Sequence, residues 1–170
     1  MLYLAVLLLA LVFAGIAMTV NEGLWSNTVS LFCVLVASLL AWDWGRVLGS
    51  FVIEKMEPSG ENQWAFGFAS VWAVFFFSVT LLRILADRIS RVRMRFIPQL
   101  DKALGILMGV MVAWCFAGFA AYTLLIPING KVWKVQDASD WQKKVFVNLS
   151  RPIYSVGKAV QGEDFPVLQM

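Results

Sequence analysis

Four long apolar runs alternate with short polar segments along the first three quarters of the chain. The runs cover about residues 2–20, 24–46, 64–86 and 100–128. At about 1.5 Å per residue, a helix of roughly 20 apolar residues crosses the ~30 Å hydrocarbon core of a bilayer. The pattern therefore predicts four membrane-spanning helices, which together form a transmembrane domain of residues 1–128.

The first run could also be a secretory signal peptide. Such a peptide has a basic segment, an apolar core of about 7–15 residues and a cleavage site of small residues. Nothing basic precedes the core here, and the core is longer. We therefore expect a helix that is retained.

Charged residues and proline mark the ends of the last two runs. Arg83 is the only charge in the third run and lies near its end, where a long side chain reaches the headgroups. Asp87 follows four residues later and can pair with it on one helix face. Pro98 suits the first turn of the fourth helix, where its missing N–H is not needed, and Asp101 lies near the positive end of that helix.

The remaining segment, residues 129–170, is mixed and polar, and residues 141–149 are predicted to form a short amphipathic helix on the membrane surface. The expected fold class is thus an all-α membrane protein: four transmembrane helices with a short polar C-terminal tail.

Composition agrees with this assignment. Of the 170 residues, 60% are hydrophobic and 15% are charged, whereas about a quarter of a soluble domain is charged. The net charge of +3 comes mostly from one loop, which argues against nucleic-acid binding. The chain has no histidine, which excludes Ser-His, Cys-His, haem-His and HExxH chemistry. Cys33 and Cys115 each lie inside an apolar run without a CxxC motif, so we expect two buried thiols and no cofactor or metal.

Basic residues set the expected orientation. The loop between the third and fourth runs carries four arginines: Arg88, Arg91, Arg93 and Arg95. Because basic loops stay in the cytoplasm, this loop is predicted to be cytoplasmic, which with four spans places both termini outside. The opposite orientation is favoured by four lysines that follow the last run: Lys131, Lys134, Lys143 and Lys144.

Small residues recur every four positions in two of the runs. In the fourth run they are Gly105, Gly109, Ala113, Ala117 and Ala121, and in the second they are Ala37, Ala41, Gly45 and Gly49. Membrane helices associate where small residues let their backbones approach. We expect the second and fourth helices to pack closely along these two seams, with an interface to another subunit as the alternative.

Asp43 and Arg46 lie one turn apart and are predicted to form an ion pair. Deep in the membrane such a pair would indicate a functional site, because a charge at the bilayer centre costs about 2.5–3.5 kcal/mol. At the membrane surface, between Trp42 and Trp44, it would be an ordinary belt feature. No two carboxylates fall in one membrane layer as acid–base catalysis requires, so we expect a protein that is not an enzyme.

The start of the fourth run carries a family resemblance. Leu100, Asp101, Lys102, Gly105 and Gly109 stand in a pattern that resembles the Leu-Asn/Asp-Arg/Lys-x-x-Gly-x-x-x-Gly signature of the colicin V production protein (CvpA) family. The helix over residues 67–86, with its charged linker, fits the same family.

The turn between the first two runs is similar as well, since Glu22 and Gly23 are followed by Val29, Ser30 and Leu31. Where the family often has basic residues, this chain has Asn21 and Glu22, and it has Val112 and Ala113 in place of a basic residue and glycine. The resemblance covers about residues 1–128.

The resemblance implies a bacterial inner-membrane protein with four helices. It further implies a non-enzymatic scaffold or accessory role in production or export of a peptide toxin and in envelope maintenance. Some relatives carry an extracytoplasmic protease domain after the helices, but this chain has only a short tail there. The alternative function is a small channel or transporter subunit that oligomerises along the glycine/alanine seams. The expected partners are the lipid bilayer and either a second copy of the chain or another membrane protein.

Overall fold

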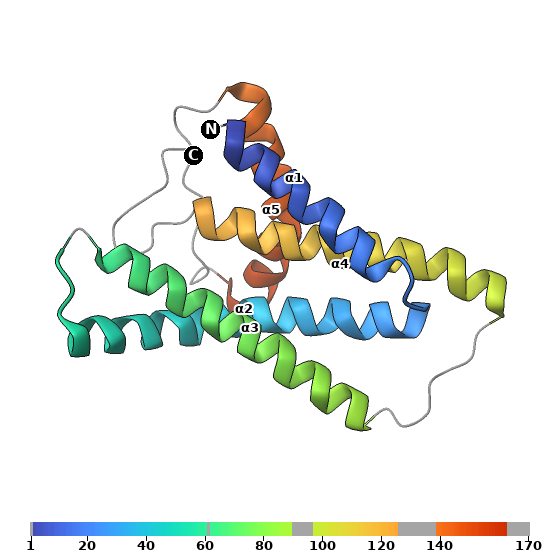
Figure 1. Ribbon diagram of the computed structural model, residues 1–170, viewed down its shortest axis with the longest axis horizontal. Helices are drawn as coiled ribbons and strands as arrows, with labels where there is room; N and C mark the ends of the chain where they lie inside the picture. The colour runs from blue at the N-terminus through green and yellow to red at the C-terminus, as the bar shows by residue number, and fades with distance from the viewer. Residues whose placement is uncertain (1, 61, 90–96, 126–138, 163–170) are drawn as a thin grey trace.

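The structure is a computed structural model that describes residues 2–60, 62–89, 97–125 and 139–162. These residues form five α-helices and no strand (Figure 1): α1 (Leu2–Thr19), α2 (Leu24–Met56), α3 (Gln63–Ile89), α4 (Pro98–Leu125) and α5 (Asp140–Gln161). The predicted all-helical fold is confirmed for this part of the chain.

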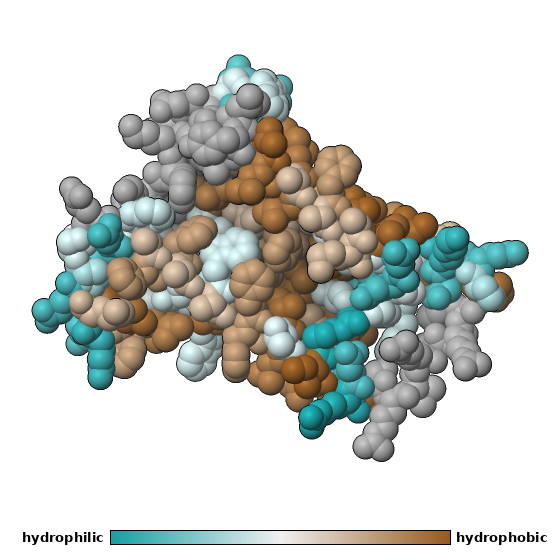
Figure 2. Space-filling view, in the orientation of Figure 1, coloured by the Kyte–Doolittle hydropathy of each residue, from teal (hydrophilic) through white to brown (hydrophobic). Residues whose placement is uncertain are grey.

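Three of the helices, α2, α3 and α4, are long and apolar enough to cross a membrane. The described apolar part of α1, Ala5–Thr19, is shorter. Large apolar side chains on these helices are exposed, among them Phe13, Phe32 and Phe77. Figure 2 shows hydrophobic residues over the middle of the molecule and hydrophilic residues at the ends of the long helices. This distribution is the one that a surrounding bilayer requires.

The helices form two antiparallel pairs, in which α2 packs against α3 and α1 packs against α4 (Figure 1). Aromatic rings fill the core between them. The rings of Phe75 in α3 and Phe119 in α4 stack with centroids 4.1 Å apart, and Trp72 meets Phe119 edge-on at 5.3 Å. Trp42 of α2 meets Tyr122 of α4 edge-on at 5.7 Å. These large rings join the two pairs into one core.

Local sequence explains where the helices begin and end. The helix α2 continues through residues 47–53 and ends at Met56. The next residue, Glu57, caps it in a left-handed conformation with φ of 44°. Pro58 follows and cannot continue a helix, because it has no N–H to donate. At the start of α4, Pro98 is the first helical residue, as predicted from the sequence.

The helix α5 corrects the expectation for the tail. It has 22 residues rather than the nine predicted, and it packs against α4. Its buried positions follow a helical period: Gln142, Phe146, Ser150, Ile153 and Gly157. Pro152 removes one backbone hydrogen bond, but the same face stays buried on both sides of it, and these contacts stabilise the helix across the proline.

Candidate functional site

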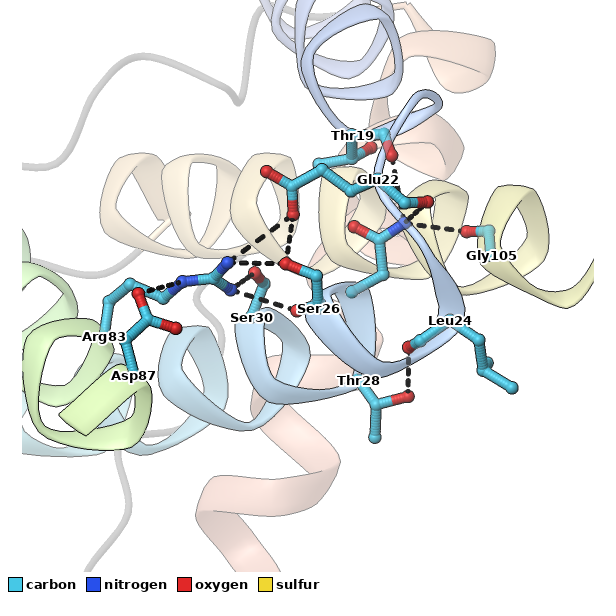
Figure 3. Close-up of polar contacts among 10 residues, drawn as sticks. Thr19, Glu22, Leu24, Ser26, Thr28, Ser30, Arg83, Asp87 and Gly105 are labelled. Atoms are coloured by element: carbon cyan, nitrogen blue, oxygen red, sulfur yellow. Dashed lines mark hydrogen bonds and ion pairs between the residues drawn. The ribbon is translucent and has the colours of Figure 1, made fainter. Parts of the chain in front are cut away.

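Asn27, in the first turn of α2, is fully buried where three helices meet. Figure 3 shows the polar contacts in this region, with Thr19, Glu22 and Gly105 labelled. Its Nδ2 donates to the carbonyl oxygens of Thr19 at 3.0 Å and Gly105 at 2.8 Å, and lies 3.3 Å from that of Glu22. Thr19 ends α1 and Gly105 lies in α4. One amide group therefore joins α1, α2 and α4.

Arg83, near the end of α3, reaches across to the start of α2 (Figure 3). Its guanidinium donates to the Ser26 carbonyl oxygen at 3.0 Å and to the hydroxyls of Ser26 and Ser30. Its Nε lies 3.4 Å from Asp87, which confirms the predicted pair, and its Nη2 lies 3.7 Å from Glu22. Through this side chain α3 is fastened to α2.

Asp101 of α4 caps the N-terminus of α2. The backbone N–H of Leu24 donates to Asp101 Oδ1 at 2.9 Å. Gly23, the N-cap residue, has no side chain that could accept this bond, and a Cβ on Gly23 would lie 2.8 Å from Asp101 Oδ2. The carboxylate thus lies in the first turn of its own helix and also at the positive end of α2, where a negative charge is stabilising.

The small-residue seam of α4 faces α1 and the α1–α2 turn. A Cβ on Gly105 would lie 3.0 Å from a carbonyl oxygen of the turn, and a Cβ on Gly109 would lie 2.8 Å from Thr19 Oγ1. Gly15 of α1 approaches Ala113 equally closely. All five seam positions are buried: Gly105, Gly109, Ala113, Ala117 and Ala121. The seam is used for packing inside the chain.

The two glycines of the α2 seam meet α3. A Cβ on Gly45 would lie 2.7 Å from the Cα of Val71, and a Cβ on Gly49 would lie 3.2 Å from the Cα of Gly67. All four seam positions are buried: Ala37, Ala41, Gly45 and Gly49. The expected packing of α2 against α4 is present, but the close contacts of Gly45 and Gly49 are with α3 and not with the small residues of α4. The helices α2 and α4 do touch, through larger side chains such as Trp42 and Tyr122.

Asp43 and Arg46 do not form the expected ion pair within the described part of the chain. Gln161, at the end of α5, donates from Nε2 to Asp43 Oδ2 at 2.6 Å. The Arg46 guanidinium lies over the Trp42 ring, 5.6 Å from its centroid. Both residues are exposed. The contact from α5 could not be foreseen, because the predicted tail helix ended twelve residues earlier.

Of the four arginines expected to set the topology, Arg88 is exposed in the last turn of α3. The other three, Arg91, Arg93 and Arg95, lie outside the described residues.

We call the residues at this end of the bundle the polar cluster: Thr19, Glu22, Ser26, Asn27, Ser30, Arg83, Asp87 and Asp101. Their side chains or carbonyl groups connect α1, α2, α3 and α4 by hydrogen bonds and ion pairs. Among the residues that the structure describes, no group of three or more His, Cys, Asp or Glu side chains is placed to hold a metal ion. The arrangement fixes how four helices meet.

Sequence reasoning identified Asp101, Gly105 and Gly109 but missed Asn27 and the reach of Arg83 to α2. Two signals were present. Asn27 is an amide inside an apolar run, where a polar side chain needs an internal partner. Ser26 and Ser30 are four residues apart and so lie on one face of α2.

This geometry defines a class: a helical membrane protein whose first four helices are joined at one end by a polar cluster around the buried Asn27. Residues 4–150 match the model of the family described as Colicin V production protein, and the chain belongs to this family. The match includes the whole polar cluster and the first half of α5. Searches among curated proteins and solved structures returned no significant match.

Proposed function

We propose that the chain is a non-enzymatic scaffold or accessory protein of the bacterial cytoplasmic membrane. In this proposal it acts in the production or export of a colicin V-type peptide toxin and in envelope maintenance. Membership of the colicin V production family supports the process, and the apolar helices support the membrane location.

The scaffold role is supported mainly by what the residues of the family motif at the start of α4 contact. Asp101 caps α2, Gly105 accepts a hydrogen bond from Asn27, and Gly109 makes room for Thr19. The residues on which the family resemblance depends therefore hold helices together. A motif that served chemistry would instead be expected to leave reactive groups free to meet a substrate.

The proposal includes four membrane spans with both termini outside. With 18 residues, α1 is about 27 Å long at about 1.5 Å per residue, close to the hydrocarbon thickness. The polar cluster and Arg88 lie at the end of the bundle where the arginine loop begins. The positive-inside rule then assigns this end to the cytoplasm.

A toxin assay tests the role. In a colicin V-producing strain that lacks this chain, we expect less toxin in the medium, measured as the zone of growth inhibition. Immunoblotting of cell extracts distinguishes failed export, which leaves toxin inside, from failed production. Plasmid-borne wild type should restore secretion, whereas Arg83→Met should restore it only in part. The matched control Lys55→Met removes an exposed cation from the other end of α2 and should complement fully.

Unchanged toxin levels in and outside the deletion strain would overturn the proposed process. The non-enzymatic part has its own variant, Asp43→Asn, which removes an exposed carboxylate while preserving its shape. Full complementation is expected. Loss of toxin secretion by a stably folded Asp43→Asn protein would instead point to acid–base chemistry.

The channel alternative depended on seams that were free to meet another subunit. Gly105 and Gly109 contact the end of α1 and the turn into α2, and Gly45 and Gly49 contact α3, so the glycines of both seams meet neighbours within one chain, which favours the scaffold.

A further inference from the structure

A stripe of basic residues runs along the outward face of α5. Lys144, Arg151 and Lys158 are spaced by seven residues, and seven residues bring a helix back to within about 20° of the same direction. All three side chains are exposed. We call these three residues the basic stripe. Asp140, in the first turn, is the only acidic residue of the helix.

The opposite face of α5 is held against the bundle at two points. In the middle of α5, the Leu149 carbonyl oxygen packs against Gly118 of α4. A Cβ added at Gly118 would lie only 2.5 Å from this oxygen, so the backbones of α4 and α5 are in direct contact. At the end of α5, Gln161 donates to Asp43 of α2. The basic stripe is thus carried by a helix that cannot roll without breaking both contacts.

These contacts also set the level of α5 relative to the membrane. Gly118 lies seven residues before the end of α4, so the crossing is about 10 Å from that end and far from the polar cluster. Figure 1 shows α5 running across α4, not along it. Where α4 passes through the bilayer, α5 therefore lies roughly in the plane of the membrane. Interfacial helices are buried about 5–10 Å into the boundary between headgroups and acyl chains.

The three cations of the basic stripe need anionic partners near the boundary of the membrane. Within the described part of the chain, none of them forms an ion pair. Lysine and arginine stems can extend from a helix at this depth to the headgroups. Trp141, which is 51% exposed, adds an indole of the kind that sits at the headgroup level.

From these contacts we infer that α5 is a binding surface for the headgroups of anionic phospholipids. The leaflet is the one on the side of the bundle where α2 is joined to α3, opposite the polar cluster. The phosphate groups of the headgroups meet the basic stripe, while the buried face keeps its contacts with α4. This inference concerns lipid recognition and is independent of the role in toxin production.

A lipid titration of the full-length protein in detergent tests the inference. Phosphatidylglycerol, phosphatidylcholine, inorganic phosphate and poly-glutamate are added separately, and bound lipid is counted by native mass spectrometry beside the melting temperature. Each cation near an anionic membrane surface raises the binding constant roughly fivefold. Three cations therefore set an upper bound of roughly a hundredfold on the preference for an anionic lipid. We expect phosphatidylglycerol to bind at least ~10-fold more tightly than phosphatidylcholine, and this preference to fall as salt rises.

The decisive variant is Lys144→Gln/Arg151→Gln/Lys158→Gln, which should lose most of the preference for phosphatidylglycerol. Its matched control, Lys55→Gln/Arg88→Gln/Lys102→Gln, removes the same number of charges from exposed sites outside α5 and should keep it. Equal preference in wild type and the α5 variant, or loss only in the control, would overturn the inference. The inference would also be overturned if the preference of the wild type for phosphatidylglycerol did not change with salt. This measurement needs only the wild type, so the test remains valid if the α5 variant fails to fold.

Inorganic phosphate and poly-glutamate test whether the basic stripe binds an anion other than a lipid headgroup. If inorganic phosphate shifts the melting temperature as phosphatidylglycerol does, the stripe binds free phosphate and not a headgroup. If only poly-glutamate does so, the partner is an acidic protein segment. Either result contradicts the lipid assignment.

Discussion

Replacement of Arg83 by methionine tests the polar cluster at its most connected residue. Methionine keeps an unbranched apolar stem but is shorter and removes every hydrogen-bond donor. The change breaks three hydrogen bonds to Ser26 and Ser30 and two ion pairs, to Glu22 and Asp87. All of these except the Asp87 pair join α3 to α2 or to the turn before it.

The magnitude follows from the number and exposure of these contacts. Hydrogen bonds between membrane helices contribute roughly 0.6 kcal/mol each on average, so three give about 2 kcal/mol. The ion pairs add little, because the side chains of Arg83, Glu22 and Asp87 are 30%, 42% and 67% exposed, and exposed pairs contribute about 0.2–1 kcal/mol before screening. We expect Arg83→Met to lower the free energy of unfolding by about 2 kcal/mol.

The assay is reversible unfolding of the purified chain in mixed micelles as the fraction of denaturing detergent is raised. Two matched variants separate charge from geometry. Arg83→Lys keeps the charge but not the planar fork of donors, and should lose about 1 kcal/mol. Glu22→Gln removes only the longer ion pair, and should lose at most ~0.5 kcal/mol.

The reasoning fails if Arg83→Met is as stable as the wild type. It also fails if Glu22→Gln is as damaging as Arg83→Met, because charge pairing would then outweigh the hydrogen bonds. A double-mutant cycle with Ser30→Ala adds an independent check, with an expected coupling of roughly 0.6 kcal/mol.

Three further variants probe other contacts. Gly118→Ala brings a Cβ to 2.5 Å from the Leu149 carbonyl oxygen; the overpacking should destabilise by about 1–3 kcal/mol and increase hydrogen exchange in α5, whereas Gly60→Ala, with open space around it, should not. Asp101→Ala should lower the melting temperature by removing the cap of α2, at about 1 kcal/mol, and Asp101→Asn, which retains an acceptor oxygen, should lose less. Gly109→Leu should impair folding, because the extra atoms meet Thr19 inside the chain. Size-exclusion chromatography should show the folding defect, and a liposome assay should show no ion or solute flux that the wild type has and the variant loses.

Much of the fold could be predicted from hydropathy alone, because a membrane-spanning helix needs a long apolar run and a polar link at each end. The start of α4 at Pro98 and the pairing of Arg83 with Asp87 depend only on neighbours within one helix turn or so, and both are confirmed. The sequence also indicated which residues are small enough for close packing.

What the sequence could not supply was the partner of each close contact. A seam such as Gly105 and Gly109 specifies that another segment approaches, but any segment with a matching surface fits it, and the structure places the end of α1 and the turn into α2 there. The same limit applies to Asp43, whose partner Gln161 lies 118 positions away. The helix α5 was underestimated because Pro152 obscures a periodic face that becomes stable only through contacts with α4.

The most direct test of the account is the side of the membrane on which each loop lies. In a Cys33→Ser/Cys115→Ser background, the single replacements Asn21→Cys and Gly60→Cys place a thiol at the turn of the polar cluster and at the opposite end of the bundle. A charged, membrane-impermeant thiol reagent applied to spheroplasts should label the Gly60→Cys protein and an N-terminal cysteine tag, and should label the Asn21→Cys protein only after permeabilisation. Labelling of the Asn21→Cys protein in sealed spheroplasts, or protection of the N-terminal tag, would contradict a four-span bundle with its polar cluster on the cytoplasmic side.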